Sequence, residues 1–176
     1  MDNNLAIEFV NRTLKEGVYG YTLRKYVNID TWDHILTNNL DGIKFVQLTD
    51  FNYSRCFSYY FMEDIELKQD FFSPEAKKEV INRGYIEFIN LSISAISSFY
   101  IIEKARYVAD GDKLKIEDID EFSNVVLKKK FEELKLKISE ENFMLVNSDE
   151  LRIPLKNVPL EDYEDDQVTY FSYLFE

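Results

Sequence analysis

Cys56 and His34 are the only cysteine and the only histidine in the sequence, and a thiol and an imidazole can together form a catalytic dyad. Such a dyad needs a partly exposed thiol, a group that orients the imidazole, and donors for an oxyanion. The neighbouring residues Arg55 and Phe57 belong to no glycine-bearing nucleophile motif. We therefore expect Cys56 to pack as a small hydrophobic side chain, and His34 to be exposed or to cap a helix.

One cysteine and one histidine are too few for a metal centre built from these ligands. Carboxylates are alternative ligands, and residues 161–166 are nearly all acidic, but they lack the alternating ligands and central glycine of an EF-hand calcium loop. The glycines form no phosphate-binding loop, because Gly17-Val18-Tyr19-Gly20 is not followed by the lysine and hydroxyl residue of that motif. The sequence predicts no metal and no cofactor.

The chain is strongly acidic, with 33 aspartate and glutamate residues against 21 lysine and arginine residues and a net charge of −12. The last 38 residues, 139–176, carry ten acidic and only two basic residues. Nucleic acids and anionic lipids are bound by clustered basic residues, so this balance disfavours both. A basic protein is the partner that the charge favours.

The predicted partner-binding site is the acidic segment after Pro159 together with nearby tyrosines. Tyrosine brings apolar area and a polar tip to an interface with little loss of rotamer entropy. The simpler alternative is a solvated acidic loop. The predicted site residues are Glu161, Asp162, Tyr163, Glu164, Asp165, Asp166, Tyr170 and Tyr173.

These features favour a non-enzymatic protein that neutralises a basic partner, as a bacterial immunity protein inhibits a nuclease-type toxin. Two alternatives stay open. One is a phage or bacterial structural or assembly factor that docks a long helix in an oligomer, and the other is a small thiol hydrolase that uses Cys56 and His34. The frequent Asn, Ile, Lys, Phe and Tyr are typical of an AT-rich bacterial or phage genome.

The composition, 45% hydrophobic and 15% aromatic over 176 residues, predicts one folded domain spanning residues 1–176. The first residues, Met1 to Asn4, lack the basic and apolar regions of a secretory signal, so we expect a cytoplasmic protein. The uncharged stretch 88–102 falls short of the ~20 apolar residues that span a bilayer, so we expect no membrane helix.

In the first half of the chain, apolar residues recur at helical spacing over 3–16, and a shorter helix is predicted over 31–40 with Asp30 or Thr31 as its cap. The segment 19–26 alternates like a strand, and an irregular connection into the next helix is the alternative. Dense aromatic and β-branched residues predict a hairpin with strands at about 43–49 and 55–63.

Ser73-Pro74-Glu75 is a strong helix start, and the pattern predicts that this central helix continues to residue 110. Asp118 and Glu121 resemble a capping box, which predicts a second long helix over 118–138. A hairpin of 143–146 and 151–155 and a final strand over 168–175 complete the prediction. The expected fold is α+β, with two long helices and shorter N-terminal helices packed on a small antiparallel sheet.

Overall fold

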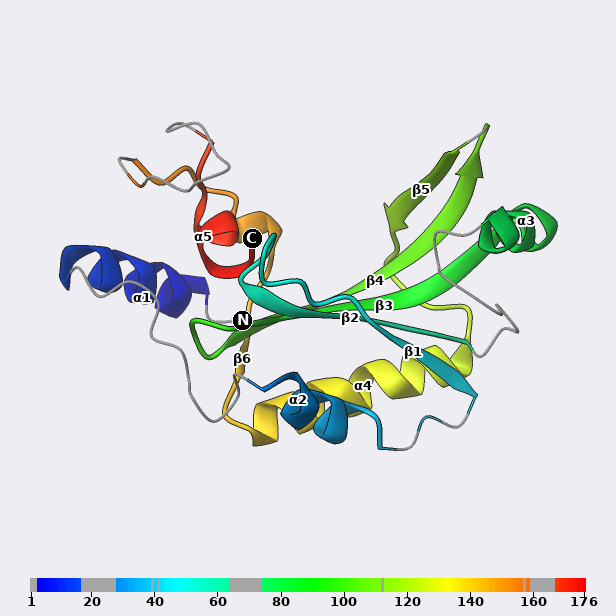
Figure 1. Cartoon of the computed structure of the whole chain (residues 1–176), viewed down its shortest axis with the longest axis horizontal. Helices are drawn as coiled ribbons and strands as arrows, with labels where there is room; N and C mark the ends of the chain where they lie inside the picture. Colours follow the sequence, from blue (N-terminus) through cyan, green and yellow to red (C-terminus); the bar gives the residue numbers. More distant parts are fainter. Residues whose placement is uncertain are drawn as a thin grey trace.

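The computed structural model describes residues 3–16, 28–38, 40, 42–63, 74–111, 113–156, 158 and 167–176. As predicted, the fold is α+β, with helices on both faces of a six-stranded sheet (Figure 1). The strand expected within 19–26 lies outside the described residues. None of the helices in the described ranges is long and apolar enough to cross a membrane.

The sheet is antiparallel in the order β1-β2-β3-β4-β5, and the short β6 adds a parallel pairing to β4, so the sheet is mixed. The predicted hairpin over 43–49 and 55–63 is confirmed by the first two strands, which pair from Ile43 opposite Glu63 onward. The strands are β1 (Ile43–Gln47), β2 (Cys56–Glu63), β3 (Tyr85–Ser94), β4 (Phe99–Asp110), β5 (Lys113–Asp118) and β6 (Met144–Leu145).

Five α-helices and one short 3-10 helix are present in the described part of the chain. The helix predicted over 3–16 is confirmed. The helix predicted over 31–40 is present but begins earlier, because Asn28 is its N-cap. The side chain of Asn28 accepts a hydrogen bond from the Asp30 N–H at 3.0 Å. The helices are α1 (Asn3–Glu16), α2 (Ile29–Leu36), α3 (Pro74–Arg83), α4 (Val125–Glu140), η2 (Asp149–Leu151) and α5 (Tyr170–Phe175).

Alternation along the strands divides the core between the two faces of the sheet. Phe57, Tyr59 and Phe61 of β2 face the layer of α2 and α4, and pack in one cluster with Trp32 and Leu134. Intervening residues of β2 and β3 face the opposite side, where they meet α3 at one end and α1 with α5 at the other. Figure 1 shows α2 and α4 together on one face and α1 and α5 on the other.

The central helix predicted over 73–110 is wrong. Its start is right, but α3 ends at Arg83, Gly84 follows with a φ of +86°, and the rest of the segment forms β3 and β4. The side chains of Ile89, Leu91 and Ile93 in β3 are buried, with the polar Asn90 and Ser92 between them, which is the period of a strand. The uncharged run is long because the sheet is covered on both faces.

The second long helix predicted over 118–138 begins later, at Val125. Residues 113–118 form β5 instead, so Asp118 ends a strand and does not cap a helix. The side chain of Asn124 is the N-cap, accepting from Val126 N–H at 2.8 Å and Leu127 N–H at 3.1 Å. Only one of the two expected long helices, α4, is therefore present.

The predictions for the end of the chain are mostly wrong. Residues 144–145 are extended but pair in parallel with β4. η2 lies mainly in the segment between the two expected strands, and of residues 151–155 only Pro154 forms a bridge. The predicted strand 168–175 is reduced to a bridge between Thr169 and Pro154, followed by α5. Thr169 and Ser172 cap this helix reciprocally, a local preference that the strand prediction overlooked.

Candidate functional site

The tyrosines of the predicted partner site lie on α5, whereas residues 161–166 lie outside the described residues. The half-buried Tyr170 donates a hydrogen bond from its hydroxyl to Asn11 Oδ1 of α1 at 2.9 Å. Tyr173 is only 1% exposed, with the guanidinium of Arg55 5.6 Å from its ring centre. Tyr170 thus keeps some surface for a partner, while Tyr173 supports α5 from inside.

A cavity of about 620 Å³ lies between α4 and the outer edge of β4, and we call it the α4 groove. It is larger than a second cavity, of about 240 Å³, near the start of α4. Its walls are residues 101–104 of β4, residues 118–120 after β5, Phe131, Glu132 and Lys135 of α4, residues 145–149, and Arg152.

Two lysines in the α4 groove lie against the ring of Phe131. The Lys104 Nζ is 5.3 Å and the Lys135 Nζ 5.5 Å from the ring centre, within the range of cation–π attraction. Lys104 also donates to the backbone carbonyl of Asp120, and Lys135 forms an ion pair with Glu132 at 3.3 Å. The positive charges in the groove therefore already have partners within the protein.

The rim of the α4 groove is acidic. Asp118 and Asp120 are exposed, and no ion pair to either carboxylate is found within the described ranges. Asp149 across the groove is 89% exposed at its side chain and lies 3.6 Å from Arg152. In all, five carboxylates and three basic side chains line the groove, so its net charge is negative.

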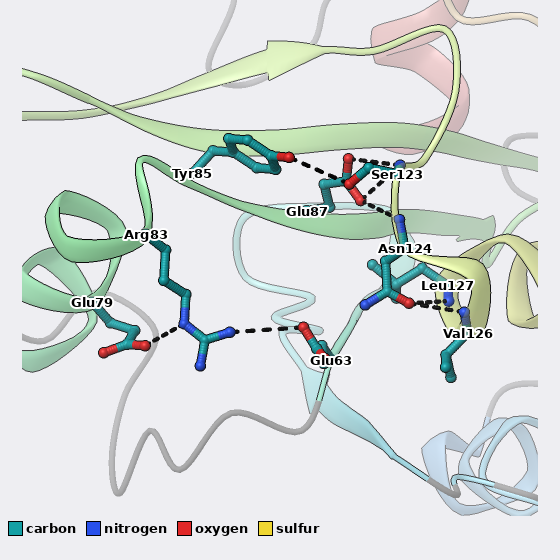
Figure 2. A network of polar contacts seen from close by, with 9 residues as sticks. All are labelled: Glu63, Glu79, Arg83, Tyr85, Glu87, Ser123, Asn124, Val126 and Leu127. Atoms are coloured by element: carbon teal, nitrogen blue, oxygen red, sulfur yellow. Dashed lines mark hydrogen bonds and ion pairs between the residues drawn. The ribbon is translucent and has the colours of Figure 1, made fainter.

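A carboxylate of the sheet holds the wall of the groove in place (Figure 2). Glu87 of β3 accepts hydrogen bonds from the backbone N–H of Ser123 at 3.0 and 3.1 Å and of Asn124 at 3.0 Å. These amides precede the first turn of α4, where N–H groups have no partner inside the helix. The clamp joins β3 to the end of the connection from β5 to α4, a connection that also carries Asp120.

A second cavity, of about 240 Å³, lies beside this clamp and is lined in part by Glu63, Arg83 and Glu87. Arg83 forms ion pairs with Glu79 one turn earlier in α3 and with Glu63 at 3.8 Å (Figure 2). Because two carboxylates already balance its charge, Arg83 is poorly suited to bind an anion. The geometry indicates a junction between α3, β2 and α4.

The structure places Cys56 and His34 as their sequence contexts suggest. Cys56 is 4% exposed in β2, its Sγ lies 3.2 Å from Ser58 Oγ, and burial raises the pKa of its thiol. His34 is exposed on α2. A buried thiol with a raised pKa is a weak nucleophile, because the thiolate is the reactive form.

The acidic rim was not among the predicted site residues. Asp118 and Glu121 were interpreted as a helix cap, and nothing local in the sequence brings residues 118–120 beside 145–149. The sequence does contain a signal for this site, the acidic run Glu117-Asp118-Ile119-Asp120-Glu121. In the structure, Ile119 of this run is half-buried, and Asp118 and Asp120 are exposed to solvent. Comparison of the chain with family models, with curated proteins and with solved structures finds no match.

Proposed function

We propose that this chain is a non-enzymatic binding protein that engages a basic protein partner and neutralises it, in the manner of a bacterial immunity protein that inhibits a nuclease-type toxin. The observation that carries the proposal is the pair Asp118 and Asp120, two exposed carboxylates at the rim of the α4 groove with no ion pair within the described ranges. A cationic side chain of a partner would supply the missing countercharge.

The charge of the whole chain supports the same partner. A net charge of −12 attracts a cationic protein over several ångströms and raises the rate of association, an effect that salt screens. The acidic segment 161–166 would add to this attraction. Lys104 and Lys135 already have contacts within the protein, and the three basic side chains that line the groove are outnumbered by its five carboxylates.

The two alternative functions have less support. The assembly factor was motivated by a long helix over 73–110, a segment that instead forms α3, β3 and β4. The thiol hydrolase requires an accessible thiolate, and Cys56 is buried with a raised pKa. Neither alternative gains an observation from the geometry.

The test compares two double variants with the same change in charge. Asp118→Asn with Asp120→Asn neutralises the rim of the groove, and Glu8→Gln with Glu16→Gln neutralises two exposed positions on α1 across the sheet. The partner is captured from an extract of the source cells, purified, and its association rate measured at several salt concentrations. We expect the rim variant to associate several-fold more slowly, with a weaker salt dependence, and the α1 variant to change much less.

A third variant tests the segment predicted from the sequence. Glu161, Asp162, Glu164, Asp165 and Asp166 are replaced by the corresponding amides, and the association rate is measured in the same way. A lower rate would assign this segment to the site as well. If both the rim variant and this variant bind like the unmodified protein at every salt concentration, the proposed function is wrong.

A further inference from the structure

We infer that the partner enters the α4 groove as a short extended segment with basic residues, and that its backbone pairs with Ile102 at the outer edge of β4. The inference rests on the proposed function, because it describes how the basic partner would be recognised. It is carried by a gap in the pairing of β4 that coincides with the groove.

The outer edge of β4 is covered from both ends. At one end β5 pairs with residues 105–110, and Ile119 N–H donates to the carbonyl of Lys104 at 3.0 Å. At the other end β6 pairs with Phe99 and Tyr100, and Val146 N–H donates to the carbonyl of Tyr100 at 3.0 Å. Ile102 lies between these two covered stretches.

The backbone groups of Ile102 face the same edge. In a strand, the N–H and C=O of successive residues point to opposite sides, so residues two apart share a side. The carbonyls of Tyr100 and Lys104 both bond outward, and Ile102 lies two residues from each. No bond to its N–H or C=O at this edge is found among the residues the structure describes.

One residue of an extended segment would pair with this open position. A strand added at an open edge supplies a donor and an acceptor together, and a buried backbone group without a partner is costly. Successive side chains of the added strand would point to opposite faces of the sheet. One face presents Asp118, which lies opposite Ala105, and Glu103, whose carboxylate also accepts from Asn90 at 3.0 Å. Basic residues on that side of the segment would meet both carboxylates.

The side of the segment that faces α4 would meet apolar side chains, with Lys104 and Lys135 beside the ring of Phe131. Ile102 pairs with Leu91 of β3, and both side chains belong to the cluster that includes Phe131 of α4. The segment expected from this geometry alternates basic residues with β-branched residues. A second copy of the chain is a poor occupant, because two molecules of net charge −12 repel each other.

The experiment uses the full chain and a capped peptide, acetyl-Lys-Val-Lys-Val-Lys-amide, with amide hydrogen exchange followed by NMR. We expect saturating peptide to slow exchange at Ile102 at least about tenfold, since exchange requires the bond to open. The amide of Val108, opposite Lys115 of β5, serves as the control and should change little.

Two methylated peptides test the direction of pairing. In antiparallel pairing, the valine opposite Ile102 has its side chain on the α4 side and turns its N–H toward β4, so methylation of the valine nitrogens should abolish binding. Methylation of the lysine nitrogens removes donors that face away, so this peptide should bind nearly as well as the parent. The same peptide with glutamate in place of lysine should not bind, because the rim carboxylates would repel it.

The outcomes separate the inference from the proposed function. If the parent peptide does not bind, or if it binds without slowing exchange at Ile102, strand pairing is wrong even when the rim variant still impairs partner binding. Exchange can also be measured without peptide at several protein concentrations. If exchange at Ile102 then slows as the protein concentration rises, a second copy of the chain pairs with this edge, and the inference is wrong. If neither the rim variant nor the variant of residues 161–166 alters binding of the partner, the proposed function itself fails.

Discussion

The carboxylate of Glu87 accepts a hydrogen bond from the backbone N–H of Asn124 at 3.0 Å, and this bond ties the third strand to the start of α4. The side chain of Asn124 in turn caps the helix. The two residues form one relay from the sheet to the first turn of the helix (Figure 2). In sequence, the relay lies between two walls of the α4 groove, residues 118–120 and the helix α4.

Replacing Glu87 with alanine should lower the free energy of unfolding by about 1–2 kcal/mol, because the N–H groups of Ser123 and Asn124 lose their acceptor. Urea unfolding measures the change. Glu8→Ala, at an exposed position of α1, is the control and should stay within about 0.5 kcal/mol of the unmodified protein. Equal midpoints for both variants would show that Glu87 does not anchor α4.

Asn124→Ala should cost about 1 kcal/mol, since the N–H groups of Val126 and Leu127 lose the side chain that caps them. Asn124→Ser keeps a capping oxygen and should recover most of the loss. The measurement is again urea unfolding, with helix content followed by circular dichroism. A serine variant as unstable as the alanine variant would point to a role of Asn124 other than capping.

The start of α3 and the first hairpin could be predicted because their signals are local. Pro74 follows a hydroxyl residue, and aromatic residues of β2 alternate over a short distance. The central helix failed because a strand covered on both faces resembles a buried helix in composition. Asn90 and Ser92 are two residues apart and alternate with buried neighbours, which is the period of a strand. The long uncharged run nevertheless favoured a helix in the prediction.

The site was harder to predict than the fold. The α4 groove joins residues 118–120 to residues 145–149 across α4, and the open position at Ile102 results from the registers of two other strands. Registers are set by the packing of whole strands, so no local pattern reveals that Ile102 is uncovered. The concentration of charge at 139–176 could be read directly, because composition needs no structure.

Glu133 should make stability sensitive to acid. Burial raises the pKa of Glu133, but the hydrogen bond from Lys137 and the charge of Lys130 outweigh it and hold the pKa below the ordinary value of 4.5. A carboxyl group whose pKa is lower in the folded than in the unfolded state stabilises the fold at pH values above its unfolded-state pKa. This contribution is lost as the pH falls through the folded-state pKa.

Glu133→Gln should therefore be about 1–2 kcal/mol less stable than the unmodified protein at pH 7, since the buried Lys130 loses its counterion. The difference should shrink as the pH falls below about 4.5, because protonation then removes the same charge from the unmodified protein. Unfolding midpoints at pH 7 and pH 3 check this. Glu132→Gln, on the exposed side of α4, is the control, and a constant difference at both pH values would contradict the assignment.

The thiol of Cys56 should react roughly 100-fold more slowly with iodoacetamide in the native protein than in guanidinium chloride, because burial both hides it and raises its pKa. Mass spectrometry follows the labelling. Native labelling as fast as that of the unfolded chain would require an accessible thiolate. The thiol hydrolase would then regain its nucleophile.

The two ends of the described chain are joined by bonds between residues far apart in sequence. Tyr170 of α5 bonds to Asn11 of α1 across 159 positions, and Asn147 N–H donates to Asn3 Oδ1 at 2.9 Å. Closing such a large loop costs more entropy than forming the hairpins of the sheet. We expect the antiparallel strands to form in the folding transition state and α1 to dock after it. Substitutions on α1 that destabilise the protein should therefore speed unfolding more than they slow folding.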